Sequence, residues 1–292
     1  MPAEVPAALW LVDKPAGPTS HDVVAGVRRR LGGRRVKVGH AGTLDPFATG
    51  LLVVLVGRAT RLAPYLSGLD KTYLATLRLG AVSATGDVEG PILEKGPPAG
   101  GEAVEAALSG FLGRQRQRVP QHAAVKVDGE RLYRRARRGE SVEAPEREIV
   151  IHDLRLVDGD DDRGTVRILV RCSKGTYIRQ LAMDLGERLG CGAYCQALRR
   201  TAIGELSVER AVPPEGVSAT GGLGLRAGLA HLPTRRLDDE EAAAVRHGRP
   251  LAPSAAEAFP SASPVALVAD DRLVAVAHPD DDGALRPAVV LG

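Results

Sequence analysis

A single carboxylate lies in a glycine-rich segment of the N-terminal region. Residues 39–50 read Gly-His-Ala-Gly-Thr-Leu-Asp-Pro-Phe-Ala-Thr-Gly, and Asp45 is the only acidic residue among them. Pro46 disfavours helical geometry at Asp45. Two interpretations are open. An aspartate followed by proline is a common helix start, whereas an ionised carboxylate in a loop can transfer protons or act as a nucleophile. Taken alone, the segment favours the helix start.

Two other side chains, Tyr73 and Arg179, stand out by their positions. Aromatic residues make up only 3% of the chain, so composition alone rarely places a tyrosine beside a charged motif. By itself Tyr73 would be core packing on a half-buried strand. Arg179 falls in the first turn of a predicted helix, where a cation opposes the helix dipole. That position indicates a specific carboxylate partner for Arg179.

Positive charge gathers in two segments of the chain. Residues 28–37 hold six cations and no acid, and residues 114–138 hold nine cations against Asp128 and Glu130. The acidic residues concentrate elsewhere, as at residues 158–162 and 280–282. A solvated helix face would explain one such run, but two runs match the electrostatic footprint of a phosphate backbone. The sequence therefore favours a nucleic-acid ligand.

Further motifs accompany the Asp45 segment in a consistent order. They are Asp13-Lys14-Pro15 with Gly17, Thr19 and Ser20, then Lys71-Thr72-Tyr73, then Cys-Ser-Lys-Gly-Thr-Tyr-Ile-Arg at residues 172–179, then residues 184–191, and Leu198-Arg199-Arg200. Together they resemble the bacterial TruB family of tRNA pseudouridine synthases, whose catalytic loop is also similar to that of dyskerin-type enzymes. The resemblance covers roughly residues 9–204, and several ordered motifs are far more specific than one.

The resemblance implies roles for individual residues. Asp45 would be the catalytic carboxylate, Arg179 its counter-charge, and Tyr73 a side chain that packs against the flipped base and helps to remove the proton from C5. The resemblance places Leu198 in the uracil pocket and gives His40 a contact to RNA at the vacated base position. The expected substrate-binding residues are His40, Tyr177, Leu198 and Lys126.

The implied reaction explains why these residue types are needed. Conversion of uridine to pseudouridine breaks the bond from C1′ to N1, turns the base, and joins C1′ to C5 before a proton is lost. It consumes no redox equivalents and no nucleotide, so we expect no cofactor. It needs an ionised carboxylate, and a guanidinium beside Asp45 would lower the carboxylate pKa and orient it. Attack at C1′, attack on the base and elimination to a glycal all remain open, and we favour the glycal.

The target base must leave its stack before it can react. The resemblance implies that the substrate is tRNA and that the target is uridine-55. The protein would recognise the T stem-loop by its shape. Residues 113–147 resemble the family's insertion that grips RNA. There the chain departs from the usual Pro-Pro-x-Tyr-Ser-Ala pattern, because His122 replaces a tyrosine and Ala123 a serine ahead of Lys126. The departure concerns local RNA contacts and not the catalytic set.

Periodicity predicts the elements that must position these side chains. Residues 51–56 form an apolar run typical of a strand buried on both faces. Residues 71–79 and 166–173 alternate as half-buried strands. Helical spacing follows from residue 178, with Gly190 as C-terminal cap, and residues 22–31 and 102–112 also predict helices. This mixture indicates an α+β fold, which the resemblance specifies as a mixed or antiparallel sheet with flanking helices.

Composition shifts suggest the domain boundaries. Pro, Gly, Ser and Ala crowd together at residues 212–225 and 253–264, as in linkers or loose loops. We expect a catalytic domain over residues 1–212, a linker over residues 213–234, and a small C-terminal domain over residues 235–292. The resemblance suggests that this last domain is PUA-like.

The remaining features bound the cellular setting. The N-terminus has no signal-peptide pattern, and no apolar stretch of the first half approaches the roughly 20 residues that a membrane helix needs. We expect a cytoplasmic protein without a membrane contact. Three cysteines argue against a disulfide framework, and without a nearby ligand cluster they predict buried thiols and no metal site; they are Cys172, Cys191 and Cys195.

The resemblance favours a monomer without an obligatory protein partner. One alternative is a tRNA-binding folding chaperone whose catalysis is incidental or lost, but intact Asp45, Tyr73 and Arg179 argue against loss. Another is a glycoside hydrolase. That class usually needs a second carboxylate near the first, and none is evident for Asp45.

Overall fold

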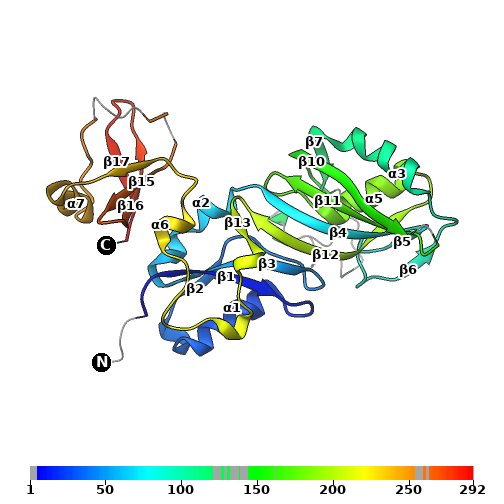
Figure 1. The fold of residues 1–292 in the computed structure, drawn as a ribbon, viewed down its shortest axis with the longest axis horizontal. Coiled ribbons are helices and arrows are strands. Elements are labelled where there is room, and N and C mark those ends of the chain that lie inside the picture. The colour runs from blue at the N-terminus through cyan, green and yellow to red at the C-terminus, as the bar shows by residue number, and fades with distance from the viewer. Residues whose placement is uncertain are drawn as a thin grey trace.

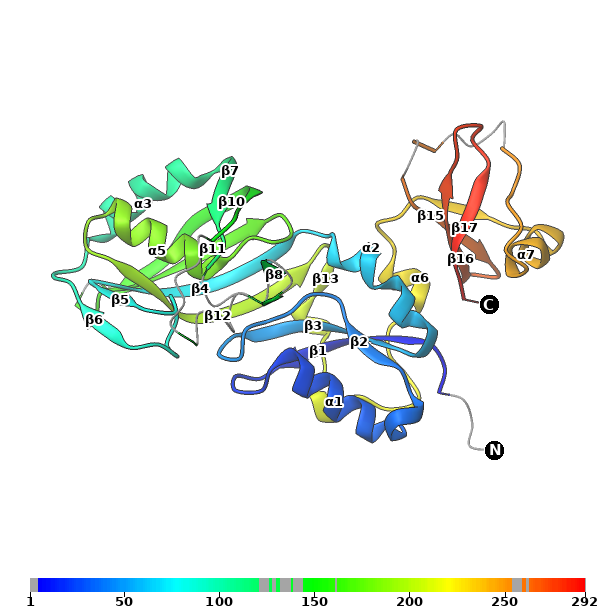
Figure 2. The ribbon, with the colours of Figure 1, turned by 180° about the vertical axis from the view of Figure 1, so that it is seen from behind.

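The computed structural model describes residues 5–120, 126–127, 130–131, 138, 144–160, 162–253, 259–260 and 263–291. The chain forms a large mixed sheet with helices packed on it, followed by a smaller C-terminal sheet that stands to one side (Figure 1). Seen from behind, the N-terminal strands and the helix over Ser20–Arg30 lie at the end of the large sheet nearer the C-terminal sheet (Figure 2). The expected α+β class is confirmed.

The described helices are α1 (Ser20–Arg30), α2 (Ala63–Ser67), α3 (Gly101–Leu108), α5 (Ile178–Arg188), α6 (Leu225–Gly228) and α7 (Asp239–Arg246). Short 3-10 helices are η1 (Gly33–Arg35), η2 (Gly57–Leu62), η3 (Ser109–Phe111), η4 (Val208–Arg210) and η5 (Pro214–Gly216). The strands of the large sheet are β1 (Ala8–Lys14), β2 (Val38–His40), β3 (Thr49–Val56), β4 (Lys71–Leu79), β7 (Gly113–Arg118), β10 (Glu146–Asp160), β11 (Thr165–Cys172), β12 (Ala193–Ile203) and β13 (Leu206–Ser207). Elsewhere lie β5 (Ala81–Ser83), β6 (Ile92–Glu94), β8 (Lys126–Val127), β9 (Glu130–Arg131), β14 (Thr234–Arg236), β15 (Val265–Ala269), β16 (Arg272–Pro279) and β17 (Leu285–Val290).

The large sheet runs in the order β1-β3-β12-β4-β11-β10-β7. Neighbouring strands in this series are antiparallel except β3 and β12, which pair in parallel over only two residue pairs, Arg199 with Thr49 and Arg200 with Gly50. At this short seam the N-terminal strands meet the rest of the sheet. The segment of residues 39–50 ends on the same seam.

Burial follows the predicted periodicity. The apolar run is entirely buried in β3, as expected for a strand covered on both faces. In β4 every second residue from Lys71 to Leu79 is buried, so Tyr73 shares a face with Ala75 and Leu77. That face packs against α5 and α3 in one hydrophobic core. The alternation predicted for these strands is therefore confirmed.

Helix boundaries follow local capping chemistry. Helix α1 begins at Ser20, two residues before its predicted start, because Thr19 and Asp22 form a capping box. Helix α5 is confirmed from Ile178, and Gly190 follows it with φ of 74°. Helix α3 ends at Leu108 and continues as a 3-10 turn through Phe111, so it is shorter than predicted.

The segment over residues 213–234 is packed, contrary to the expectation of a loose linker. Val212 N donates to Leu11 O at 2.9 Å, and Leu223 N donates to Leu9 O at 2.7 Å. Val217 and Leu229 are buried. Small residues allow this path to lie close against β1, which a count of Pro, Gly and Ser does not reveal.

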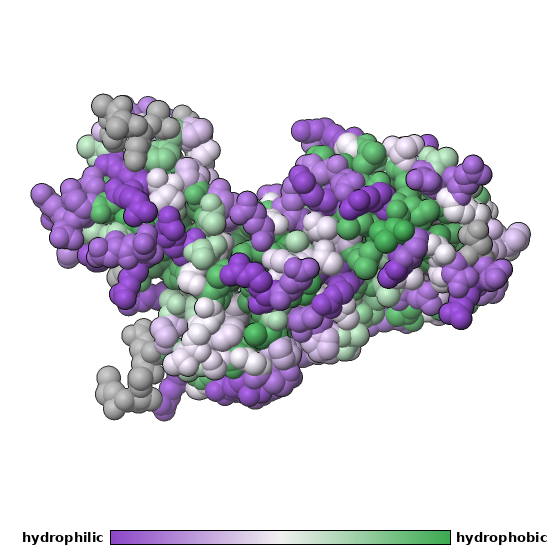
Figure 3. Space-filling model, in the orientation of Figure 1, coloured by the Kyte–Doolittle hydropathy of each residue, from purple (hydrophilic) through white to green (hydrophobic). Residues whose placement is uncertain are grey.

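The C-terminal region forms a four-stranded sheet in the order β14-β15-β16-β17, with α7 against it. This arrangement is consistent with the expected PUA-like domain. Arg61 Nη1 from η2 donates to Val290 O at 2.8 Å, and the Tyr65 hydroxyl lies 3.3 Å from His278 Nε2. One apolar cluster continues from β1 and β3 into β15, β16 and β17. In space-filling view a notch separates the upper parts of the two regions (Figure 3).

No helix in the described ranges is long and apolar enough to cross a membrane. Cys172, Cys191 and Cys195 are free and buried, as predicted. Burial raises the pKa of the Cys172 thiol to about 11. Across the described residues, His, Cys, Asp and Glu side chains form no group of three that could hold a metal ion.

Candidate active site

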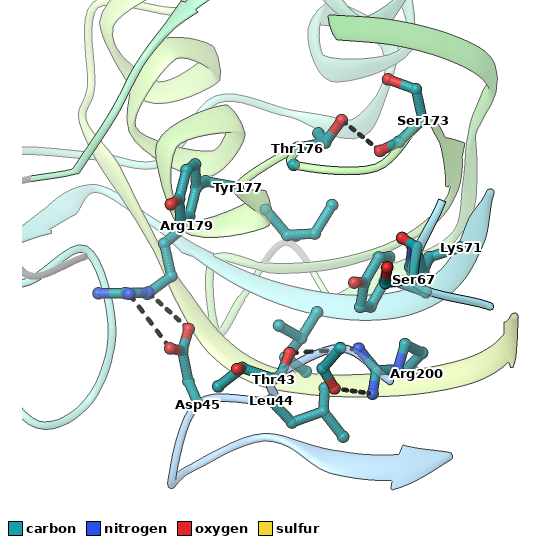
Figure 4. Close-up of a pocket in the computed structure, with 15 residues that line it drawn as sticks. Thr43, Leu44, Asp45, Ser67, Lys71, Ser173, Thr176, Tyr177, Arg179 and Arg200 are labelled. Atoms are coloured by element: carbon teal, nitrogen blue, oxygen red, sulfur yellow. Dashed lines mark hydrogen bonds and ion pairs between the residues drawn. The ribbon is translucent and has the colours of Figure 1, made fainter. Parts of the chain in front are cut away.

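A cavity of about 370 Å³ opens where the segment of residues 39–50 meets β4, β12 and the start of α5 (Figure 4). Polar side chains lie at both ends, with Asp45 and Arg179 at one and Lys71 and Ser67 at the other (Figure 4). The lining residues come from five separate parts of the chain: Gly42, Thr43, Leu44, Asp45, Ser67, Lys71, Tyr73, Ser173, Gly175, Thr176, Tyr177, Ile178, Arg179, Leu198 and Arg200.

Asp45 and Arg179 form the ion pair that the family resemblance implies. Arg179 Nε donates to Asp45 Oδ2 at 2.8 Å, and Nη2 donates to Oδ1 at 3.3 Å. Such two-point contacts fix the plane of a carboxylate as well as its charge. The Arg179 side chain is 5% exposed, whereas that of Asp45 is 35% exposed. The carboxylate is thus held by a buried cation and still reaches the cavity.

A second carboxylate, Asp87, shares the same guanidinium. Arg179 Nη1 lies 3.1 Å from Asp87 Oδ2 and donates to Thr85 O at 3.0 Å. Asp87 is 3% exposed, and its Oδ1 accepts from Thr85 Oγ1 at 2.5 Å and from Glu89 N at 3.0 Å. Its oxygens face protein donors and not the cavity.

Asp87 corrects the expectation that no second acid lies near Asp45. Its role is not visible in the sequence, because residues 85–87 are typical of a turn. As a buried group bound to Arg179, Asp87 positions the guanidinium, and it does not supply the second exposed carboxylate that a glycoside hydrolase uses.

The segment that carries Asp45 is an irregular loop, so Asp45 does not cap a helix. Ser20 ties it to α1, since Leu44 N donates to Ser20 Oγ at 2.8 Å and Ser20 Oγ donates to Leu44 O at 3.1 Å. Lys14 Nζ donates to the carbonyls of Pro18 at 2.8 Å and Pro46 at 3.1 Å. Lys14 is fully buried, and burial lowers its pKa to about 8. This supports a structural role for Lys14.

Arg200 holds the other side of the loop and was not predicted to belong to the site. It is 1% exposed. Its Nη1 donates to Thr43 O at 3.2 Å and its Nη2 to Gly42 O at 3.0 Å (Figure 4). Its Nε donates to Leu51 O at 2.8 Å. Three carbonyls around Asp45 are therefore fixed by one guanidinium.

Three further predicted site residues, Tyr73, Tyr177 and Leu198, also line the cavity. Tyr73 and Leu198 are buried in its wall. Burial raises the pKa of Tyr73, so its phenol is held in the protonated form. Tyr177 directly precedes α5, and its backbone N–H donates to Gln117 Oε1 at 2.8 Å. The Arg147 guanidinium lies 5.3 Å from the Tyr177 ring centroid.

Of the other predicted residues, the structure places His40 outside the cavity wall. His40 ends β2 and does not line the cavity; burial and nearby Arg200 lower its pKa, and its buried Nδ1 has no partner among the described residues. Lys126 lies in the short strand β8. His122 and Ala123, where the chain departs from the family pattern, lie outside the described residues.

Lys71 is a further cavity residue to which the sequence analysis gave no role. Its Nζ donates to Ser67 O at 2.6 Å and Leu69 O at 2.5 Å. Burial lowers its pKa to about 8. Its motif was visible in the sequence, but the direction of its side chain was not.

Two family models and several curated proteins match this chain. Residues 28–178 match a family model described as the N-terminal domain of TruB family pseudouridylate synthase, and residues 179–220 match the tRNA pseudouridylate synthase B C-terminal domain. The tRNA pseudouridine synthase B of Synechococcus sp. (strain WH7803) is 46% identical over 98% of this chain and 97% of its own. The protein of the same name from Thermobifida fusca (strain YX) is 47% identical over 96% and 97%.

Solved structures share the fold. A chain in the crystal structure of a Cbf5-Nop10-Gar1 complex matches with a TM-score of 0.73 and 25% identity, over 98% of this chain and 85% of that chain. A chain of an H/ACA RNP bound to a substrate RNA containing 2′-deoxyuridine gives the same TM-score and coverage at 24% identity. The mixed sheet with flanking helices is thus confirmed.

Proposed function

The chain belongs to the TruB family of pseudouridylate synthases, and we propose that it isomerises uridine-55 in the T loop of tRNA. It is a tRNA pseudouridine synthase, an isomerase that acts on tRNA. We propose three further points: that uridine-55 is the target, that the named residues have the roles given below, and that the protein binds the T stem-loop.

One observation carries the assignment of the site: Arg179 binds both oxygens of Asp45, and Asp45, still 35% exposed, lines the cavity together with Tyr73 and Leu198. The ion pair favours the charged form of a carboxylate. An apolar wall beside an ionised carboxylate suits a flat, uncharged base that has been turned out of its stack.

We assign the reaction steps to these groups. Asp45 takes the proton from C2′ while the C1′–N1 bond breaks, which leaves a glycal and a uracil anion. The base turns, C5 bonds to C1′, and the proton returns to C2′. Finally C5 loses its proton and N1 gains one, so that atoms and charge balance. We assign Tyr73 to packing against the base. It does not act as a preformed phenolate, because burial raises its pKa and keeps the phenol protonated.

We also propose which residues contact the RNA and where the protein works. His40, Tyr177, Leu198 and Lys126 contact the RNA, and the insertion over residues 113–147 grips the T stem-loop. The protein works in the cytoplasm, where its substrate tRNA is found, as a monomer without an obligatory partner. The strand register supports the insertion, because Arg118 of β7 pairs with Glu146 of β10, so the chain leaves and rejoins one sheet edge.

The test uses an unmodified tRNA transcript incubated with pure protein and no added cofactor, followed by chemical mapping of pseudouridine. We expect conversion of uridine-55. The Asp45→Asn variant should lose activity by about 10² to 10⁴-fold, the usual range for a residue that moves a proton. Asp158→Asn is a matched control, since Asp158 is an exposed carboxylate paired with Arg167.

The outcomes separate the parts of the proposal. If wild-type protein converts no T-loop uridine, the proposed function is wrong. If Asp45→Asn converts uridine-55 as fast as Asp158→Asn, the function stands and the site assignment is wrong.

A further inference from the structure

A second cavity, of about 690 Å³, lies between the end of α1 and η2. Four of its lining side chains are cations, and none of the described residues that line it is acidic. The lining residues are Val5, Leu31, Gly32, Arg35, Val36, Lys37, Gly57, Arg58, Thr60 and Arg61. We call this set the basic cavity. It contains the end of the first basic run, which the active site does not use.

The two basic runs differ in how their charge is balanced. In the second run Arg114 pairs with Glu148, and Arg116 Nε lies 3.2 Å from Glu146 Oε2. In the first run no ion pair is formed by Arg35 or Lys37 within the described part of the chain, and both side chains are exposed. Unbalanced cations that converge on a hollow attract a polyanion more strongly than paired ones.

The arginines of η2 hold the other wall in place. Arg61 Nη1 donates to Val290 O at 2.8 Å, and Arg58 Nη1 donates to Leu291 O at 3.4 Å. A guanidinium has five N–H donors, so the bond from Arg61 to a carbonyl orients its side chain and leaves other donors for an anion. The basic cavity is therefore built partly on the junction with the C-terminal sheet.

The basic cavity is distant from the reacting base. Strand β3 begins beside the Asp45 loop at Thr49 and ends at Val56, directly before Gly57 of the cavity. Eight residues of strand span roughly 25 Å at about 3.3 Å each. A T stem of about five pairs is no longer than about 17 Å, because an A-form RNA pair rises less than the roughly 3.4 Å of B-DNA. A tRNA whose T loop lies at Asp45 would therefore meet the cavity with a part of the molecule beyond its T stem.

We propose that the basic cavity binds the phosphodiester backbone of tRNA outside the T arm. This rests on the proposed function, because the same tRNA places its T loop at Asp45. The site reads charge and not sequence, since cations without a base-reading pattern position a nucleic acid without specifying it.

The experiment compares two substrates, an unmodified full-length tRNA and a hairpin of the T arm alone. The variant carries Arg35→Gln and Lys37→Gln. We expect its KM for full-length tRNA to rise about ten-fold at near-physiological salt, with kcat unchanged. Both constants for the hairpin should stay at wild-type values. The slope of log affinity against log salt for full-length tRNA should fall by about two, because each removed cation leaves roughly one phosphate without its protein counter-charge.

Arg163→Gln serves as the control for charge alone, because Arg163 is 82% exposed near the tip of the β10–β11 hairpin. It should leave both substrates unaffected. The proposal is overturned if the double variant weakens the hairpin as much as full-length tRNA, if it changes neither, or if Arg163→Gln matches its effect. Calorimetry with free AMP gives a further check. If the double variant loses binding of AMP and keeps the wild-type KM for full-length tRNA, the occupant is a small nucleotide and the proposal is overturned. Wild-type inactivity on both substrates would instead refute the proposed function.

Discussion

Arg179 is a buried cation between two carboxylates of different exposure. Asp45 reaches the cavity, whereas Asp87 is enclosed and bonded to Thr85 and to the backbone of Glu89. Two anchors on separate nitrogens restrict both the position and the rotation of the guanidinium. Asp87 therefore acts on the reaction through Arg179, as a positioning residue.

Replacing Asp87 tests this chain of contacts. Asp87→Asn keeps the side-chain shape but removes one of the two negative charges on Arg179. Since a misplacement of about 1 Å can cost about 100-fold in rate, we expect kcat to fall by about 10-fold to 100-fold with KM for tRNA within about two-fold. Single-turnover and steady-state kinetics on the same transcript would measure both.

Glu89→Gln is the matched control for Asp87→Asn, because Glu89 is an exposed acid two residues away. It should retain most of the activity. If Asp87→Asn raises KM and preserves kcat, Asp87 supports RNA binding and does not orient the Asp45 carboxylate.

Lys71 makes a prediction about stability and pH. Burial lowers its pKa in the folded protein from 10.5 to about 8. Between pH 8 and 10.5 the unfolded chain therefore binds more protons at Lys71 than the folded chain does. The free energy of unfolding gains up to about 1.4 kcal/mol per pH unit from this group as pH rises through that window.

Urea unfolding of wild type and Lys71→Met between about pH 7 and pH 10.5 would isolate this contribution. The difference, wild type minus variant, should increase as pH rises above about 8 and stay level below it. A difference that decreases with pH would mean that the charged form of Lys71 is the favoured one in the folded protein.

At the scale of elements, the site depends on the short seam between β3 and β12. Gly50 has φ of 101°, and a Cβ placed on it would lie 2.3 Å from the Arg200 carbonyl oxygen. A contact that close forces the two strands apart. The glycine therefore permits the approach that brings the Asp45 loop to Arg200.

Gly50→Ala should thus lower both stability and activity. A positive φ alone costs an alanine about 1 to 2 kcal/mol, and the backbone clash adds to it. Gly248→Ala is the control, because Gly248 has φ of 76° and open space around its Cβ position. Thermal unfolding and pseudouridine formation would be compared for both variants. Equal losses in the two would indicate that only φ matters and that the seam tolerates separation.

At the scale of the whole molecule, the two sheets share apolar packing. In β16 Val276 belongs to the cluster that continues into β1 and β3, whereas Val274 belongs to the cluster under α7. A shared cluster couples the unfolding of the parts that contribute to it. The C-terminal sheet is thus fastened by side chains as well as by the carbonyls that Arg61 and Arg58 bind.

This coupling can be followed through the single tryptophan, Trp10 of β1. Val276→Ala should cost about 1 to 3 kcal/mol and lower the temperature at which Trp10 fluorescence reports unfolding. Val274→Ala removes the same atoms from the other cluster and should lower that temperature less. If Val276→Ala leaves the Trp10 transition unchanged, the sheets unfold independently.

The sequence alone determined the local parts of this protein. Alternation placed Tyr73 on the buried face of β4, and helical spacing placed Arg179 at the start of α5. These features depend on neighbours a few residues away, so periodicity and backbone chemistry express them directly. The loop around Asp45 is an exception, because the residues by themselves favoured a helix start there and the structure shows none. The ordered motifs added the expected family, which the comparisons confirm.

Only the tertiary structure decided which distant groups meet. Asp45 and Arg179 are 134 positions apart, and Arg200 lies 157 positions from the carbonyl of Thr43. Local periodicity does not encode such pairs, because they depend on the spatial order of β3, β12 and β4 in the sheet. The same holds for charge. Both basic runs look alike in the chain, but pairing across β7 and β10 neutralises arginines of one, while the path of α1 and η2 gathers cations of the other around a hollow.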